Sequence, residues 1–383
     1  MSQLVRDEVP QPSTADAEVP DIFEISDVTV GYNHACVIDQ DGALYCWGAN
    51  ALGQLGLGDQ DARTVPTRVG EADDWLTVSA GRFHSCGLRE GGVLQCWGGG
   101  AFGQVGQIQD AVLTPTTVAA PSGAWTSVSA GQWHTCALND DGEAYCWGYN
   151  LLGRLGDGSG AGTEQDPEAS IETPTLVVLP VTLVAISCGA SHTCAIDDDG
   201  ALWCWGSGED DRLGVAAADE CTLGDSTVPC ALDATPLADG RAYATISAGG
   251  AHTCATQSDG ALWCWGQGAY GQLGVGELDP PMASTPARVT GDYAAVASGA
   301  SHTCVLDANG AALCFGDGAN GQLGRDLAAA DEPEAVDLGQ DAVRIASGAL
   351  GSCAITASNG GFCWGFSAYA GSSTPQAIVS VSL

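Results

Sequence analysis

Residues 31–56 read GYNHACVIDQDGALYCWGANALGQLG, and most of the remaining chain consists of variations on this stretch. It opens with Gly31-x-x-His34-x-Cys36 and continues, after a short turn, into an apolar segment that contains Cys46. It ends in a glycine-rich turn, Gly53-Gln-Leu-Gly56. Self-similarity at a fixed period indicates a repeat architecture, and this signal outranks any local prediction of secondary structure.

The opening motif recurs every 50 to 60 residues, and its histidine slot holds every histidine of the chain: His34, His84, His134, His192, His252 and His302. A seventh, degenerate copy has Gly351 in that slot. Each unit contains about four short strand-like segments with turns, and no helical period appears. A Thr-Pro or Val-Pro segment closes the unit, and proline suits an edge strand. The sequence therefore predicts an all-β fold, a seven-bladed β-propeller with four-stranded antiparallel blades of about 50 residues.

The pattern Gly-x-x-His-Thr, Asp-Gly-x-Leu-x-x-Trp-Gly and Asn-x-x-Gly-Gln-Leu-Gly resembles the regulator of chromosome condensation repeat family. The resemblance covers roughly residues 26–383, with repeats that start near residues 28, 76, 126, 184, 244, 294 and 343, and it implies a seven-bladed propeller. Residues 1–25, which are acidic and rich in proline and serine, are expected to form a disordered tail. The chain looks like a cysteine-rich, secreted bacterial type of this family.

Fourteen of the 17 cysteines form seven pairs that are each ten positions apart: Cys36 with Cys46, Cys86 with Cys96, Cys136 with Cys146, Cys194 with Cys204, Cys254 with Cys264, Cys304 with Cys314 and Cys353 with Cys363. A three-residue hairpin loop that ends in a left-handed Gly42 places Cys36 directly opposite Cys46. Opposite residues of antiparallel strands lie within disulfide reach, so seven cross-strand disulfides are predicted. Two alternatives are small buried apolar side chains and a zinc site, although His34, Cys36 and Cys46 would supply only three ligands per blade.

Three cysteines fall outside these pairs. Cys221 and Cys230 lie in an insertion at residues 209–235, which they are expected to staple, and a second insertion spans residues 157–173. Cys188 stands where Ala80 and Ala130 precede the repeat glycine of their units, and we expect a buried free thiol there.

The charge balance excludes several classes of function. There are 47 acidic residues against 11 arginines and no lysine, which gives a formal net charge of -36. This argues against nucleic-acid binding, including the chromatin role of some members of the resembled family, and against an anionic membrane surface. No apolar run approaches the roughly 20 residues of a membrane helix. The acidity fits either a high-salt habitat or a soluble secreted surface.

Seven disulfides indicate an oxidising compartment, so we expect an extracellular, periplasmic or cell-surface protein. The first eight residues contain no apolar signal core, which leaves two explanations: a removed signal peptide, or reduced thiols in a cytosol.

Metal and catalytic signals are weak. The turns that contain Asp39, Asp41, Asp141, Asp197 and Asp199 have carboxylates at alternate positions, which leaves calcium possible at these acidic loops. They lack the distal bidentate acid of a dedicated calcium loop and are first of all hairpin turns. No nucleophile elbow, phosphate loop or zinc-binding helix motif is present, so neither a cofactor nor an active site is predicted. The repeated histidines are expected to hydrogen-bond neighbouring strands.

The predicted function is a non-catalytic propeller that binds another protein, whose identity the sequence does not reveal, through its rim loops. Loops on a rigid scaffold are where binding usually resides. Two alternatives remain open: an enzyme or glycan-binding protein that uses the central channel, and a structural spacer in an envelope assembly.

Overall fold

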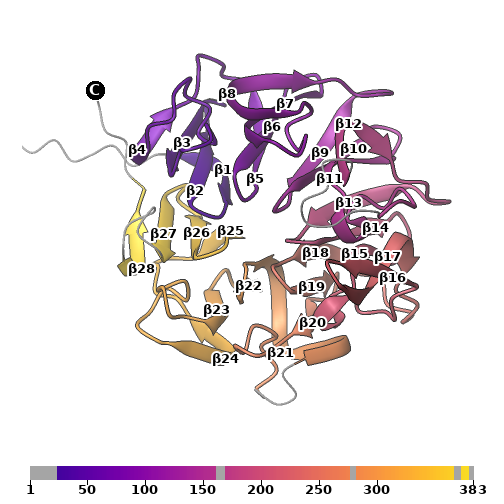
Figure 1. Ribbon diagram of the computed structural model, residues 1–383. Helices are drawn as coiled ribbons and strands as arrows, with labels where there is room; N and C mark the ends of the chain where they lie inside the picture. The colour runs from indigo at the N-terminus through magenta and orange to yellow at the C-terminus, as the bar shows by residue number, and fades with distance from the viewer. Residues whose placement is uncertain (1–23, 161–168, 277–281, 366–371, 379–383) are drawn as a thin grey trace, which may run out of the picture.

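The strands form a closed ring of blades around a central axis (Figure 1). This computed structural model describes residues 24–160, 169–276, 282–365 and 372–378, so the predicted tail at residues 1–25 lies almost entirely outside the described residues. Five sheets form one blade each, and a seven-stranded sheet forms two. The prediction of an all-β, seven-bladed propeller is therefore confirmed. Among the described residues, no helix has the length and apolar character needed to span a membrane.

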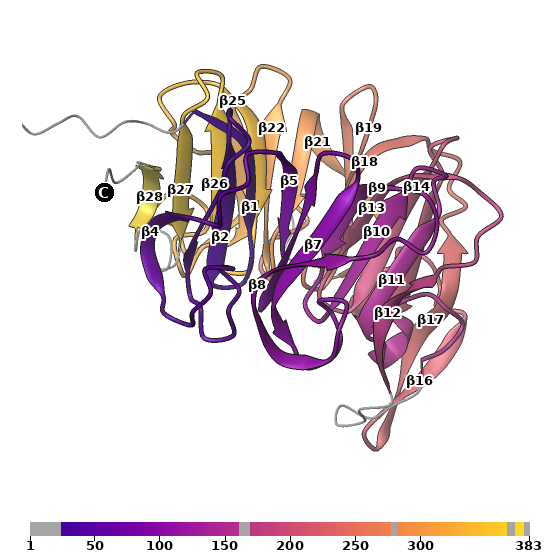
Figure 2. The same cartoon turned by 90° about the horizontal axis from the view of Figure 1, so that it is seen from above.

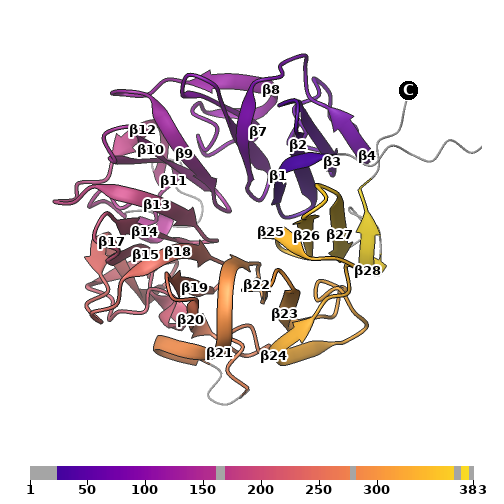
Figure 3. The same cartoon turned by 180° about the vertical axis from the view of Figure 1, so that it is seen from behind.

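The strands follow one another around the ring in chain order (Figure 3). They are β1 Ile25–Val30, β2 His34–Asp39, β3 Leu44–Gly48 and β4 Arg63–Arg68 in blade 1; β5 Trp75–Ala80, β6 His84–Arg89, β7 Val93–Gly100 and β8 Gln109–Val118 in blade 2; β9 Trp125–Ala130, β10 His134–Asn139, β11 Ala144–Tyr149 and β12 Ser170–Leu176 in blade 3; β13 Leu183–Cys188, β14 His192–Asp197, β15 Leu202–Ser207, β16 Asp219–Leu223 and β17 Ser226–Pro236 in blade 4; β18 Tyr243–Ala248, β19 His252–Gln257, β20 Ala261–Gln267 and β21 Met282–Ser298 in blades 5 and 6; β22 His302–Asp307, β23 Ala312–Asp317 and β24 Ala329–Ala335 in blade 6; and β25 Ala342–Ser347, β26 Gly351–Thr356, β27 Gly361–Gly365 and β28 Ser372–Ala377 in blade 7.

Two regions of the ring depart from the plan of separate four-stranded blades. Blade 4 gains a fifth strand, because the insertion folds back as a hairpin of β16 and β17. Blades 5 and 6 share β21, which pairs with β20 in its first part and with β22 in its second. Elsewhere a turn separates the outer strand of one blade from the inner strand of the next.

The second strand of each blade is almost entirely buried, because each blade packs between two others. Every residue of β10, β14 and β26 is buried, so hydrophobic alternation is lost there. The outermost strand is more exposed, and in blade 1 it carries Pro66 at a position where a missing N–H group is tolerated. The largest fully buried side chains lie between blades: Trp97, Trp147, Trp205, Trp265, Phe315 and Trp364.

A ring of backbone hydrogen bonds surrounds the channel. In each blade, the N–H of the residue after the repeat glycine donates to the carbonyl of the repeat glycine in the next blade, over 3.0–3.3 Å. This ring closes, since Ala349 donates to Gly31 over 3.2 Å. A Cβ added at Gly81 would lie 2.4 Å from the Gly131 oxygen and 2.5 Å from Cε1 of His84. The position therefore requires glycine because of this close approach.

The six histidines connect neighbouring blades through side chains. Each Nε2 lies 2.8–2.9 Å from the hydroxyl of a Ser or Thr in the next blade, namely Ser85, Thr135, Thr193, Thr253, Thr303 and Ser352. The first five hydroxyls donate in turn to a backbone carbonyl in the glycine-rich turn of the preceding blade, over 2.8–3.0 Å. A hydroxyl has one proton, and here it is donated to the carbonyl. The hydroxyl oxygen therefore accepts the hydrogen bond from the histidine, which must carry its proton on Nε2. We call this arrangement the histidine relay.

The same carbonyls also accept from a tryptophan of the next blade. The indole Nε1 atoms of Trp97, Trp147, Trp205 and Trp265 lie 3.0 Å from the carbonyl oxygens of Gln54, Gln104, Arg154 and Arg212. Each of these glycine-rich turns is thus tied to the following blade by two donors.

The seam between blades 7 and 1 lacks the relay. Blade 7 has Gly351 in the histidine slot, and blade 1 has Ala35 in the hydroxyl slot. An apolar cluster joins the two blades instead, with Ile25, Val28 and Ile355 among its buried members. The carboxylate of Asp27 adds polar links, because it pairs with Arg344 of blade 7 and accepts from Thr77 of blade 2 over 2.8 Å.

The seven cysteine pairs form identical rungs between the second and third strands of each blade. The two cysteines of every pair face each other directly in the strand register. Their Cα atoms are 4.1 Å apart, and the sulfur atoms are bonded in each predicted pair: Cys36 with Cys46, Cys86 with Cys96, Cys136 with Cys146, Cys194 with Cys204, Cys254 with Cys264, Cys304 with Cys314 and Cys353 with Cys363. Each rung closes a short hairpin loop. Its main effect is to reduce the conformational entropy of the unfolded chain.

The histidine relay predicts that the fold is sensitive to mild acid. Burial lowers the pKa of His34 to about 4 and that of His84, His252 and His302 to about 3, and it holds the pKa of His134 and His192 well below 6.5. An unfolded histidine titrates near 6.5, so below that pH the unfolded chain binds more protons than the folded one. The contribution of the neutral histidines to the free energy of unfolding is therefore fully present above pH 6.5 and is lost as the pH falls toward 4.

The measurement is the free energy of unfolding in denaturant between pH 7 and pH 5. Its slope should approach about 8 kcal/mol per pH unit, which is about 1.4 kcal/mol for each of six protons. The variant His34→Gln removes one of the six titrating groups, so it should reduce the slope by about 1.4 kcal/mol per pH unit. A stability that stays flat over this range would refute the neutral, buried state of the histidines.

Candidate interaction surface

One face of the ring carries the Gly-x-x-His loops, and we call it the loop face. It also carries the connection between the third and fourth strands of each blade, as the hydrogen bond from Ala49 to the carbonyl of Asn33 shows in blade 1. Both predicted insertions are connections of this kind, in blades 3 and 4. Residues 161–168 of the first insertion lie outside the described residues, whereas the second is described throughout.

The second insertion forms a stapled hairpin that projects from the ring (Figure 2). A two-residue turn, Gly224-Asp225, connects β16 to β17. Cys221 and Cys230 are disulfide-bonded with Cα atoms 5.8 Å apart, and they are not directly opposite, because Cys221 faces Val228. Both cysteines are buried, while Thr222 and Thr227 are exposed. The staple therefore holds a small apolar core beneath an exposed outer surface.

This core continues into the ring. Cys221 and Cys230 cluster with the buried residues Tyr149, Leu151 and Leu152 of blade 3. The half-buried rings of Phe102 and Trp133 pack against the same cluster. The hairpin is thus anchored on the loop face of blades 2 and 3 as well as on its own blade.

A chain of aromatic rings crosses the loop face from the channel to the hairpin. The distances between ring centroids are 6.3 Å for Tyr32–Phe83, 5.2 Å for Phe83–Trp133, 5.3 Å for Trp133–Phe102 and 4.6 Å for Phe102–Tyr149. The two positions after the repeat glycine supply Tyr32, Phe83 and Trp133 in blades 1–3, but in blades 4–7 they hold only Ala190-Ser191, Gly250-Ala251, Ala300-Ser301 and Ala349-Leu350. The loop face is therefore strongly asymmetric. The sequence prediction missed this cluster. The signal that could have revealed it is the presence of Tyr32, Phe83 and Trp133 at positions that hold mostly alanine, serine or glycine in the later blades.

The central channel opens on the loop face as a small pocket of about 150 Å³. Glycine, alanine and serine from all seven blades form most of its wall, together with Val30, Tyr32, Arg82 and Gln132. None of the described residues that line it is acidic. The paired carboxylates of a glycoside hydrolase are thus missing from this wall.

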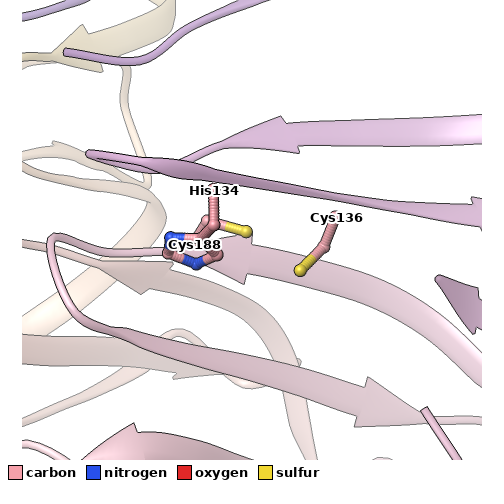
Figure 4. A group of neighbouring side chains, drawn as sticks. All are labelled: His134, Cys136 and Cys188. Carbon is pink, nitrogen blue, oxygen red and sulfur yellow. The ribbon is translucent and has the colours of Figure 1, made fainter. Parts of the chain in front are cut away.

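One group of three potential metal ligands occurs among the described residues. His134, Cys136 and Cys188 place their ligand atoms within 4.8 Å of one another, and all three are buried (Figure 4). Cys136, however, is bonded to Cys146, so it offers no thiolate. Cys188 is a free thiol, and burial raises its pKa to about 12. The oxidised protein therefore has no complete ligand set in this group.

The acidic turns have a structural role in the hairpins. Oδ1 of Asp39 accepts from the N–H groups of Asp41 and Ala43, over 3.0 and 2.8 Å. The equivalent turns of blades 3 and 4 are held in the same way, by Asn139 for Asp141 and Glu143 and by Asp197 for Asp199 and Ala201. The first residue of each turn thus folds the hairpin. Calcium binding at these turns stays a prediction.

The geometry defines a disulfide-bonded propeller with an elaborated loop face. Family models described as Regulator of chromosome condensation (RCC1) repeat match residues 41–88, 91–138, 141–196 and 259–306 in one version and residues 25–54, 76–104, 125–154, 183–211, 238–272 and 293–322 in another. These matches cover more than half of the chain. The chain belongs to the RCC1 repeat family.

Two plant proteins are similar to parts of this chain. The Arabidopsis thaliana ultraviolet-B receptor UVR8 is 34% identical over 110 residues, which are 29% of this chain and 23% of the receptor. The mitochondrial RCC1 domain-containing protein RUG3 of the same plant is 30% identical over 122 residues, which are 32% of this chain and 26% of that protein. The matched stretches thus span about a quarter of these relatives.

Solved structures support the fold. Yeast RCC1 (Prp20), crystallised with Kap60, has a TM-score of 0.74 at 19% identity, with 100% of this chain and 92% of that chain covered. Human WBSCR16 has a TM-score of 0.73 at 21% identity, with 85% and 84% covered.

The thiol inventory gives a direct prediction. We expect iodoacetamide to label no cysteine of the native protein, because Cys188 is buried and protonated. After denaturation without reductant, one cysteine should be labelled, and after reduction all 17. Intact mass spectrometry reads each count, and reduction of eight disulfides should add 16 hydrogens. More than one label before reduction would contradict the pairing.

Proposed function

We propose that this protein is a secreted or surface-displayed, non-catalytic propeller that binds another protein through its loop face. The observation that carries the proposal is the stapled hairpin of β16 and β17, which projects from the ring and is anchored on the aromatic chain. An exposed loop with its own disulfide is preorganised, and preorganisation lowers the entropic cost of binding. Binding proteins is also in keeping with relatives in this family, since yeast RCC1 was crystallised with Kap60.

An oxidising compartment is the second part of the proposal. Eight disulfides in one chain are typical of secreted or periplasmic proteins. The fold itself is compatible with that location, because the ectodomain of the Arabidopsis receptor kinase ACR4 has a related fold, with a TM-score of 0.54 at 20% identity.

The binding face is tested by site-specific photo-crosslinking in the native source. A photoreactive residue at Thr222 or Thr227, on the outer surface of the hairpin, should capture one defined partner. The same residue at Glu90, an exposed turn at the other end of the strands, should not.

The captured partner is then purified and its affinity measured. The double variant that combines Thr222→Arg with Thr227→Arg should weaken binding at least tenfold, because two bulky charges replace small side chains at the contact, whereas Glu90→Arg should leave it unchanged. All variants should retain eight disulfides and the thermal midpoint of the original protein. Equal capture at both faces, or an unchanged affinity of the double variant, would overturn the assignment of the loop face.

A further inference from the structure

The arginines of this acidic protein are almost all neutralised by carboxylates. The described residues include ten arginines, and eight of them form ion pairs with Asp or Glu: Arg63, Arg68, Arg89, Arg212, Arg241, Arg288, Arg325 and Arg344. A ninth, Arg154, is buried and donates to the carbonyls of Leu151 and Ala190. With more than four acids for every arginine, such pairing is the expected state.

Arg82 is the exception among the described residues. Its guanidinium has neither an ion pair nor a hydrogen bond there, and its Nε atom is buried without a partner. Three aromatic rings surround it instead, with Cζ 4.8 Å from the ring centre of Tyr32, 5.1 Å from that of Phe83 and 5.1 Å from that of Trp133. Aromatic faces stabilise the cation but leave its N–H donors unsatisfied.

These donors belong to a residue that lines the mouth of the channel. The wall there contains Arg82, Tyr32 and Gln132 on one side and the small residues of blades 4–7 on the other, with no acid among the described lining residues. The pocket of about 150 Å³ has room for a small planar group. A cation that is partly removed from water, held by aromatic rings and without a counter-charge is suited to an external anion.

We propose that the channel mouth at Arg82 is a binding site for a carboxylate. The guanidinium presents a planar fork that matches the two oxygens of a carboxylate, and Tyr32, Phe83 and Trp133 hold the fork in place. The ligand is either a small organic acid or the carboxylate end of a peptide chain, and both present the same chemistry. The site is separate from the outer surface of the hairpin, so it stands independently of the proposed protein partner.

The test uses pairs of probes that differ only in charge. Benzoate is compared with benzamide, and the tripeptide Gly-Gly-Phe is compared with its C-terminal amide, by calorimetry with the intact protein. We expect each acid to bind at least tenfold more tightly than its amide. Tighter binding of the tripeptide than of benzoate would identify a peptide terminus as the ligand, and the reverse order would identify a small acid.

Variants then locate the site. Arg82→Gln should lose the preference for acids, and Arg82→Lys should retain only part of it, because lysine lacks the planar fork. The matched control is Arg89→Gln, which removes another arginine that lies over an aromatic ring, Trp75, at the other end of the strands. Binding should also shift the indole N–H signal of Trp133, and this readout needs no variant. Equal affinities for acid and amide, no binding of any probe, or an Arg82→Gln variant that binds normally would each overturn the proposal.

Discussion

The rest of the structure depends on the histidine relay between blades. A propeller must hold seven blades at fixed angles, and apolar attraction by itself has no preferred direction. In the relay, a buried Nε2–H, a hydroxyl and a backbone carbonyl must align within hydrogen-bond distance, so each blade fixes the position of the next. Removal of one partner would leave a buried polar group unsatisfied, at a cost of about 1–3 kcal/mol. The relay also fixes the glycine-rich turns, and therefore the loop face that those turns form.

The seam between blades 7 and 1 shows that the two partners of the relay depend on each other, because the histidine and the hydroxyl are both absent there. Gly351 replaces the histidine and Ala35 replaces the hydroxyl, so neither partner is left buried and unpaired. Apolar contacts of Ile25 and the polar links of the Asp27 carboxylate connect the two blades instead. Burial raises the pKa of the Asp27 carboxyl group. The ring therefore closes through packing of β1 on blade 7, and the described strands exchange no partner between the two ends of the chain.

Much of this could be predicted from the sequence, because repeated motifs report repeated contacts. Seven copies of one pattern predict seven blades, and a ten-residue spacing with a left-handed glycine in the turn places Cys36 opposite Cys46. The histidines were expected to bond neighbouring strands, but their partners are hydroxyls in the next blade, some 50 residues away, which one repeat unit viewed alone does not reveal. The aromatic chain and the unpaired Arg82 arise where individual copies depart from the pattern, and only the folded ring brings these departures together.

In this structure all six histidines are neutral, and His34, His84, His134, His192 and His252, whose hydroxyl partners donate to a carbonyl, carry their proton on Nε2. Correlation of imidazole nitrogen and proton signals by NMR, recorded from pH 7 to pH 5, tests it most directly. We expect five Nε2–H tautomers and six rings that stay neutral across this range, since burial lowers the pKa of each ring far below 6.5. Rings that titrate near pH 6.5, or a proton on Nδ1 of any of those five histidines, would contradict this assignment.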